Sequence, residues 1–315
     1  MIYIITIIIL FALIHGTMVY SRYNLLNLEN KYALKCFVSN IPAFANALEY
    51  PMSIYSYAIP CYLIFPFLSD KTICYKSGGS LYGFYIYDLY PELSKKLDNK
   101  LFWADVFAKN NINHPLSIAY KINHKINILS QYNNSTYYIL KPINGTLGHG
   151  VKKIKGCDIK KTLSKTDKDI LVQEIINDCT SAKTRHFRYV TFYDGKVFCI
   201  KEFANKEGSV TSNIHTGGIS THFNINTIQS TAKQPLNEMF GKLSNLHKNS
   251  FPMIFSIGWD VMIDCSRKNI RAICLEGNIC HGSWNKNPDN KDKKLIKIYL
   301  TKHRNFIKKN LFVEL

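Results

Sequence analysis

The first 21 residues contain no lysine, arginine, aspartate or glutamate. A helix of about 20 apolar residues spans the roughly 30 Å of a bilayer core. No basic side chain precedes this run, and VYSRYN at its end is a poor cleavage site for a signal peptidase. We favour a membrane anchor over residues 1–21. A signal peptide and a buried strand or helix of a soluble fold stay open as alternatives.

The chain also lacks any CxxC pair, although it has nine cysteines in 315 residues. Their scattered spacing fits neither a zinc site nor a small disulfide framework. An odd number of cysteines in a chain of this length predicts reduced thiols in a cytosol-like compartment.

Acidic residues are few: 22 aspartates and glutamates stand against 40 lysines and arginines, a formal charge of +18. This excess favours anionic partners such as nucleotides, phosphosugars, nucleic acid or an acidic membrane, without choosing among them. Hydrophobic residues make up 46% of the chain and charged ones 20%. A folded protein with a sizeable core is therefore expected, rather than a disordered one.

Periodicity and turn residues predict alternating helices and strands after residue 90. Helical spacing covers residues 91–112 and 234–248. Strand patterns cover residues 137–143, 170–176, 187–193, 196–203, 259–264 and 271–276. The third and fourth of these strands flank Asp194-Gly195, a strong hairpin signal.

Lys141 ends one predicted strand and is followed by a loop with Gly145, Gly148 and Gly150. A lysine supplies a point charge, and glycines let backbone N–H groups approach phosphate oxygens. The segment is no Walker A loop, because no GK[ST] follows. A hairpin with a flexible turn is the alternative interpretation.

Two predicted strands near the C-terminus carry acidic side chains, in GWDVMID and CLEGN. Glu276 and Asn278 are two residues apart and so face the same side of their strand, while Asp260 lies on the preceding one. Carboxylate and amide oxygens are the ligands that Mg²⁺ prefers. The alternative is a surface strand pair with scattered acids.

Arg188 opens a predicted strand in TRHFRYVTF, and Asn213 follows later in SNIHTGG. An arginine at this place could hold a carboxylate or a transferring phosphoryl group. The plainer alternative is a solvated arginine.

The order of these motifs resembles that of the ATP-grasp enzymes, over about residues 96–285. LDNKLFWADVFAKNNINHP resembles the entry helix of the family, LVQEII its adenine-reading strand, and SNIHTGG a stretch of its glutamate-ligase branch. IGWDVMID…CLEGN is more similar to ATP-grasp proteins associated with sugar transfer. The chain departs from the glutamate-ligase branch at His186-Phe187 and Thr211, positions that the resemblance links to the acceptor site and to part of the ribose contact.

The resemblance implies an α/β (α+β) ATP-grasp fold of two lobes with ATP between them. The implied roles are phosphate binding by Lys100, Lys141 and the loop with Gly145, Gly148 and Gly150; adenine contact by Gln173, Glu174 and Ile176; and binding of Mg²⁺, or alternatively Mn²⁺, by Asp260, Glu276 and Asn278. The implied catalytic residues are Arg188, which would hold the acceptor or the acyl phosphate, and Asn213, which would touch the phosphate end. The expected domains are an anchor at 1–21, an N-terminal lobe at 22–95 and the ATP-grasp domain at 96–315.

The expected reaction joins a small-molecule carboxylate, which can be sugar-linked, to an amine through an acyl phosphate. Modification of a cell-surface glycan is its expected setting. One alternative is an ATP-grasp phosphotransferase acting on a sugar or alcohol. A less favoured one is a basic protein that binds nucleic acid or another anionic polymer, because the charge allows it but no nucleic-acid motif is present.

Arg22, Lys31 and Lys35 follow the apolar run, so the positive-inside rule places the rest of the chain in the cytoplasm. We expect the full chain in membranes with its N-terminus retained, and a version starting at Ser21 in the soluble fraction. Cell fractionation and N-terminal sequencing check this. Recovery of the full chain as a soluble protein, or of a product cleaved near residue 20, contradicts the anchor and leaves a soluble cytoplasmic or an exported protein.

Overall fold

The structure, a computed structural model, describes residues 93, 96–144, 148–205, 209, 211–212, 218–266 and 269–279, with scattered positions between 291 and 306. The chain divides into two compact units, one of residues 95–283 and one of residues 1–94 and 284–315. Residues 1–21 and nearly all of 22–95 lie outside the described residues, so the predicted anchor and N-terminal lobe stay predictions. Within the described part, no helix has both the length and the apolar character to cross a bilayer.

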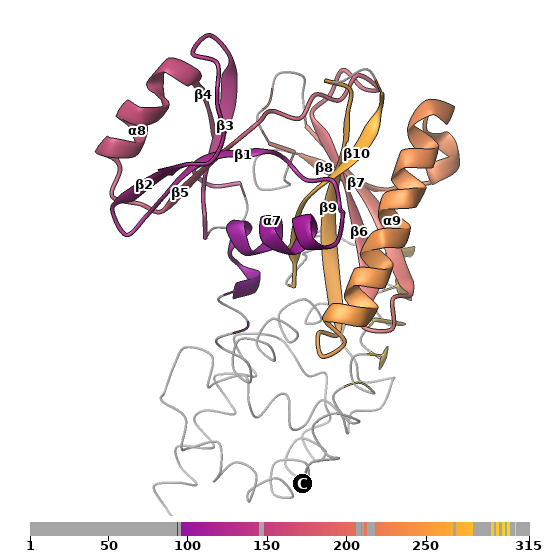
Figure 1. Cartoon of the computed structure of the whole chain (residues 1–315). Coiled ribbons are helices and arrows are strands. Elements are labelled where there is room, and N and C mark those ends of the chain that lie inside the picture. Colours follow the sequence, from indigo (N-terminus) through magenta and orange to yellow (C-terminus); the bar gives the residue numbers. More distant parts are fainter. Residues whose placement is uncertain are drawn as a thin grey trace, which may run out of the picture. The chain divides into compact units, whose positions relative to one another are not determined.

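The first half of the unit 95–283 is built on a five-stranded sheet in the order β2-β1-β5-β3-β4, with every neighbouring pair antiparallel. Its strands are β1 (Ser117–Ile122), β2 (Lys125–Ile128), β3 (Tyr137–Pro142), β4 (Lys152–Lys155) and β5 (Ile170–Gln173). The 3-10 helix η2 (Gly156–Asp158) leads into α8 (Ile159–Lys165), which lies against this sheet (Figure 1). Ile159 and Leu163 of α8 join Leu140 and Val172 in its core.

The second half is another antiparallel five-stranded sheet, in the order β10-β9-β6-β7-β8. Its strands are β6 (Arg185–Phe192), β7 (Val197–Ala204), β8 (Ile219–His222), β9 (Ser256–Asp264) and β10 (Arg271–Asn278). After the 3-10 helix η4 (Ile225–Thr227), the long helix α9 (Ser230–Ser250) runs along one face of this sheet (Figure 1). Tyr189 stacks on Phe240 of α9 at 4.2 Å, so the opposite face is left for other contacts.

The predicted hairpin around Asp194-Gly195 is confirmed: it joins β6 to β7. Gly195 has φ +79°, and a Cβ at this position would lie 2.9 Å from the carbonyl oxygen of Ser244 in α9. Glycine is required here both by the backbone conformation and by the close approach of the helix.

The helix α7 (Lys100–Lys109) begins at an N-cap, where Asn99 Oδ1 accepts hydrogen bonds from the backbone N–H groups of Leu101 and Phe102 at 2.8 and 3.2 Å. A side-chain cap of this kind fixes where a helix starts. Trp103 of α7 packs edge-on against Trp259 of β9 with ring centroids 5.3 Å apart. The cap and this aromatic contact together hold Lys100, the first residue of α7, close to the second sheet.

A bulge in β10 decides which side chains face which way. The pairing with β9 shifts between Cys274, opposite Val261, and Glu276, opposite Asp260. An inserted residue turns the following side chains to the other face of a sheet. Cys274 is therefore buried with Val261, whereas Glu276 lies on the same face as Asp260.

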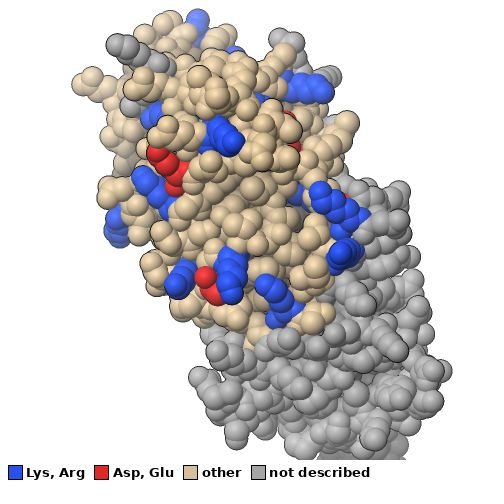
Figure 2. Space-filling view, turned by 90° about the vertical axis from the view of Figure 1, so that its right-hand side faces the viewer, with Lys and Arg blue, Asp and Glu red and all other residues tan. Residues whose placement is uncertain are grey.

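Basic side chains are scattered singly over the face shown in Figure 2, the side on which α9 lies in Figure 1. Uncharged residues separate them, and a few acidic side chains lie among them. The positive charge of the chain does not form one continuous basic surface on this face.

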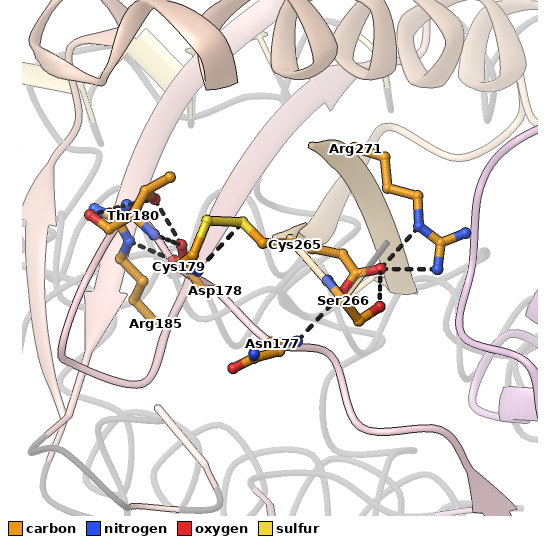
Figure 3. Close-up of a disulfide and its surroundings, with 9 residues drawn as sticks. Asn177, Asp178, Cys179, Thr180, Arg185, Cys265, Ser266 and Arg271 are labelled. Atoms are coloured by element: carbon orange, nitrogen blue, oxygen red, sulfur yellow. Dashed lines mark hydrogen bonds and ion pairs between the residues drawn. A yellow bond between two sulfur atoms is a disulfide. The ribbon is translucent and has the colours of Figure 1, made fainter. Parts of the chain in front are cut away.

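The expectation of reduced thiols is wrong for one pair, because Cys179 and Cys265 form a disulfide (Figure 3). The two cysteines are 86 residues apart in the sequence, so their spacing gave no sign of the pairing. Cys179 lies in the linker between β5 and β6, and Cys265 follows β9 directly. Cys157, Cys199 and Cys274 are free thiols.

Hydrogen bonds reinforce the disulfide on both sides. Cys265 N–H donates to the carbonyl of Asn177 at 2.8 Å, and Asn177 N–H donates to Asp264 Oδ1 at 3.4 Å. Arg271 Nε donates to Asp264 Oδ2 at 2.8 Å (Figure 3). The linker between the two sheets is thereby fastened to the β9–β10 end of the second sheet.

Replacing both Cys179 and Cys265 by serine should lower stability by roughly 2–4 kcal/mol, because the unfolded chain loses a cross-link. For a unit of this size that corresponds to a fall of about 5–15 °C in Tm, measured by thermal unfolding. Cys157→Ser, at an exposed free thiol, serves as the control and should leave Tm unchanged. Alkylation of both Cys179 and Cys265 in the folded, unreduced protein, detected by mass spectrometry, would show that the disulfide is absent.

Candidate active site

A cavity of about 360 Å³ lies within the unit 95–283, lined by both sheets and by the linker between them. Eight of the predicted site residues line it: Lys100, Lys141, Gly148, Gln173, Glu174, Ile176, Asp260 and Glu276. Pro115, Ile139, Ile175 and Met262 add apolar surface. A concave, partly apolar site with a few convergent charges is typical of a small-molecule site.

Four ionisable side chains lie opposite one another across the second sheet. Arg188 of β6 pairs with Lys201 of β7 on one side and with Asp260 of β9 on the other. Asp260 is in turn opposite Glu276 of β10. Directly opposite residues share a face of a sheet, so the row presents two basic and then two acidic side chains on the face that bears the cavity.

Arg188 and Asp260 form a bidentate ion pair. Arg188 Nε donates to Oδ1 at 2.7 Å, and an Nη donates to Oδ2 at 2.8 Å. Burial alone would raise the pKa of Asp260, but the guanidinium holds that pKa below its usual value. Asp260 is therefore ionised at neutral pH, with Arg188 as its counter-charge.

Glu276 is balanced by a cation from outside the second sheet, since Lys100 Nζ lies 3.4 Å from Glu276 Oε2. The side-chain amide of Asn278 lies 3.2 Å from Asp260 Oδ2 and 3.4 Å from Glu276 Oε1. The three predicted metal ligands therefore lie close together.

These ligands fit a hard divalent cation by their chemistry, since they offer two carboxylates and one amide group on adjacent strands. The structure does not group three or more histidine, cysteine, aspartate or glutamate side chains closely enough for a metal anywhere in its described part. Lys100 and Arg188 bind the same carboxylates, so a metal would have to share these oxygens with them. The metal role stays a prediction.

Lys141 points from β3 into the cavity and is 9% exposed. Burial lowers its pKa to about 8, although Glu276 acts to raise the pKa and Lys100 adds to the lowering. A lysine with this pKa is still mostly protonated at pH 7. Lys141 and Lys100 thus bring two positive charges to the side of the cavity opposite the second sheet.

The linker begins where β5 ends, at Gln173, three residues earlier than the predicted strand end at 176. Glu174 N–H donates to the carbonyl of Leu116, while Gln173 Nε2 donates to Ser117 Oγ at 3.2 Å. After this point the backbone leaves the first sheet and crosses to the second. Arg271 lies 3.6 Å from Glu174, which ties the start of the linker to β10.

His186 stands next to this charge row, also facing the cavity. Its ring is stacked on Phe203 with centroids 4.9 Å apart, and its Nδ1 lies 2.6 Å from Ser212 Oγ. Burial lowers the pKa of His186 to about 4, against the opposing effect of Asp260. The imidazole is therefore neutral at pH 7.

Some predicted residues are not placed in the cavity. Gly145 and Asn213 lie outside the described residues. Arg188, Asn278 and Gly150 do not line the cavity, although Arg188 and Asn278 contact Asp260, which does line it.

Lys201, fully buried beside Arg188, was not predicted. Counting residues outward from the hairpin turn could have placed Lys201 opposite Arg188. The register shift between Val190 and Thr191 makes such a count wrong by one residue.

Comparison with known proteins finds a family model that matches part of the chain. Residues 97–233 match the family model of the RimK-like ATP-grasp domain. No curated protein matches the chain.

Similar solved structures include D-alanine–D-alanine ligase from Bacillus anthracis complexed with ATP, at 15% identity and a TM-score of 0.44, covering 69% of this chain and 66% of that one. L-amino acid ligase from Bacillus licheniformis has 12% identity and a TM-score of 0.47, covering 78% and 59%. D-alanine–D-alanine ligase from Helicobacter pylori has 17% identity and a TM-score of 0.43, covering 67% and 59%. The chain thus spans about three fifths to two thirds of the length of these relatives.

The sheet topology agrees with the fold that the motifs implied, and the family match covers the motifs from the entry helix to the stretch after SNIHTGG. The chain contains an ATP-grasp domain.

Proposed function

We propose that this protein is an ATP- and Mg²⁺-dependent ligase that joins a carboxylate to an amine, with ADP and phosphate as products. The observation that carries the proposal is the cavity of an ATP-grasp domain in which Lys100 and Lys141 face the acidic pair Asp260 and Glu276. A phosphate chain needs cations on one side, and its metal needs carboxylates on the other. This cavity supplies both.

ATP would lie with its adenine at the linker and its phosphates at the charged row. Gln173, Glu174 and Ile176 line the cavity where β5 ends and the linker begins. Lys100 and Lys141 lie at the other end, near Glu276. The apolar side chains of Ile139, Ile175 and Met262 supply contact surface between these ends.

A bound magnesium ion would neutralise phosphate charge and polarise the transferring phosphoryl group. Asp260, Glu276 and Asn278 are the residues that would hold it. In this structure Arg188 and Lys100 balance the charges of Asp260 and Glu276. The arriving phosphates would in turn attract Lys100 and Lys141 away from the acidic pair.

The reaction would proceed by attack of a carboxylate oxygen of the acceptor on the terminal phosphorus of ATP, which forms an acyl phosphate and releases ADP. The amine nitrogen then attacks the carbonyl carbon, loses a proton and expels phosphate. Arg188 would hold the acceptor carboxylate, as the resemblance to the family implies, and it would have to release its ion pair with Asp260 to do so. The work of the protein is positioning and charge stabilisation, and no nucleophilic side chain is needed.

A phosphotransferase that acts on a sugar or alcohol would use the same nucleotide site. Amine-dependent release of ADP separates the two activities, because only the ligase needs the amine to complete its cycle.

The finer part of this proposal is a role in modifying cell-surface glycans. The chain would be anchored by residues 1–21, with its domain in the cytoplasm. Its support is the resemblance of IGWDVMID…CLEGN to sugar-transfer-associated ATP-grasp proteins and the uncharged N-terminal run.

Nucleic-acid binding is the weaker alternative. The scattered basic side chains of Figure 2 offer no continuous track for a phosphate backbone on that face. Such a protein would also leave the buried Arg188–Asp260 pair without a purpose.

Lys141→Ala should weaken ATP binding by roughly 10- to 150-fold, because a charge-assisted contact with phosphate contributes about 1.5–3 kcal/mol. Adenosine, which has no phosphate, should bind almost as well as before. Isothermal titration with both ligands measures the difference. Lys125→Ala, on the exposed strand β2 of the same sheet, is the matched control. Equal loss for both ligands would mean that Lys141 supports the fold rather than the phosphates.

Glu276→Gln should lower ATP turnover at least about 100-fold while the protein stays folded, because the cation loses a charged ligand worth several kcal/mol at the transition state. ADP release over a panel of carboxylates and amines gives the rate, and mass spectrometry identifies the product. Glu238→Gln, on the exposed side of α9, should be fully active. Unchanged turnover of Glu276→Gln at limiting magnesium would remove Glu276 from the metal site.

A further inference from the structure

The disulfide between Cys179 and Cys265 lies directly beside the linker that lines the cavity (Figure 3). Linker residues 174–177 belong to the cavity wall, and Cys179 comes two residues after this stretch. Cys265 follows β9, the strand that brings Asp260 to the same cavity. The disulfide therefore ties one part of the cavity wall covalently to another.

This disulfide is open to a reductant in the folded protein. Cys179 is exposed and Cys265 is half-buried, whereas the free thiols of Cys199 and Cys274 are buried. Thiol–disulfide exchange requires a thiolate to reach one of the two sulfur atoms. Exposed disulfides are in general the labile and regulatory ones, while structural disulfides resist reduction by glutathione.

The linker is held on two sides, and the disulfide matters for only one of them. Toward β6, Asp178 accepts hydrogen bonds from Thr180 N–H and from Arg185 Nε, both at 2.8 Å (Figure 3). Both side chains of the Asp178–Arg185 ion pair are about nine-tenths buried, so this side stays in place without the disulfide.

Toward β9, the disulfide is accompanied only by weaker contacts of an exposed residue in the described part of the chain. Asn177 accepts a hydrogen bond from Cys265 N–H at 2.8 Å and donates one to Asp264 Oδ1 at 3.4 Å. Water can replace such exposed hydrogen bonds at little net cost. Reduction therefore leaves the domain folded but releases the linker from β9.

We propose that the Cys179–Cys265 disulfide is a reversible redox switch of nucleotide affinity. The oxidised form holds the linker in the conformation that contacts adenine, and the reduced form lets it move. The inference rests on the proposed function, which places adenine at the linker. A nucleotide that binds the reduced form must order the linker, and this entropy cost lowers its affinity.

The chemistry of the switch is exchange with a dithiol reductant. One thiolate of the reductant attacks Sγ of the exposed Cys179, forms a mixed disulfide and expels Cys265 as a thiolate. The second thiolate of the reductant then attacks its own sulfur in the mixed disulfide and expels Cys179. Both cysteine thiolates take up the protons that the reductant lost, so the protein gains two electrons and two protons while the dithiol becomes a disulfide. Reoxidation by another disulfide reverses these steps.

The test compares ADP binding by the full chain in its two redox states. Isothermal titration gives the Kd of the oxidised protein and of protein reduced with dithiothreitol, and alkylation followed by mass spectrometry verifies each state. We expect reduction to raise the Kd about 5- to 30-fold, the factor that corresponds to ordering the backbone of one further residue. Reoxidation should restore the original Kd.

Two variants separate the disulfide from other effects of the reductant. Replacement of both Cys179 and Cys265 by serine should give the Kd of the reduced wild type, with no response to dithiothreitol. Cys157→Ser, at an exposed free thiol, should respond as the wild type does. The reduced wild type gives the same comparison if the double variant fails to fold.

A series of glutathione buffers tests whether the bond is reducible in the folded protein. We expect the pair to become reduced at the ratios of reduced to oxidised glutathione found in a reducing cytosol, and the Kd for ADP to change over the same range. Persistence of the disulfide in all these buffers would show a purely structural bond and overturn the switch.

The outcomes distinguish this switch from the proposed function. Equal ADP affinity in the oxidised and reduced states, or loss of the redox response in Cys157→Ser, overturns the switch and leaves the ligase proposal intact. Absence of ADP binding in both states removes the nucleotide site and both proposals with it.

Discussion

The bidentate ion pair between Arg188 and Asp260 is the interaction on which the arrangement of the site depends. Both side chains are about nine-tenths buried, and losing one partner of a buried pair typically costs about 3–5 kcal/mol. The pair joins β6 to β9 at the centre of the sheet and divides the row into a basic half and an acidic half. Glu276 extends the acidic half and is held by Lys100, which comes from α7 rather than from the sheet. The Lys100–Glu276 ion pair thus joins the two sides of the cavity. A bound nucleotide and its cation would replace these ion pairs with contacts of their own.

The second constraint is the linker between the two sheets. It lines the cavity from Glu174 to Asn177 and is tied to the second sheet immediately afterwards by the Cys179–Cys265 disulfide and by the contacts of Asp264 (Figure 3). The linker backbone that would contact adenine is therefore held at both ends, by β5 before it and by the disulfide after it. A linker fixed at both ends loses little conformational entropy when a ligand binds, which favours affinity.

Much of this site could be predicted from the sequence, because local patterns carried it. Asp194-Gly195 predicted the β6–β7 hairpin through the demand of its turn for a positive φ, and the two-residue spacing of Glu276 and Asn278 predicted that they share a face. The bulge before Glu276 was not predictable, since the pairing register of β10 with β9 is set in the folded sheet. The disulfide and the Lys201–Arg188 pairing were missed for the same physical reason: they join segments whose register is set by the folded sheet, not by spacing along the chain.

The most direct test of the central claim follows an oxygen atom. A carboxylate that supports amine-dependent ADP release is labelled with ¹⁸O and incubated with ATP, magnesium and the amine, and the phosphate is analysed by mass spectrometry. An acyl phosphate cleaved by the amine leaves one carboxylate oxygen on phosphorus, so each turnover should give phosphate with one ¹⁸O. Amide product accompanied by unlabelled phosphate would contradict the acyl-phosphate mechanism.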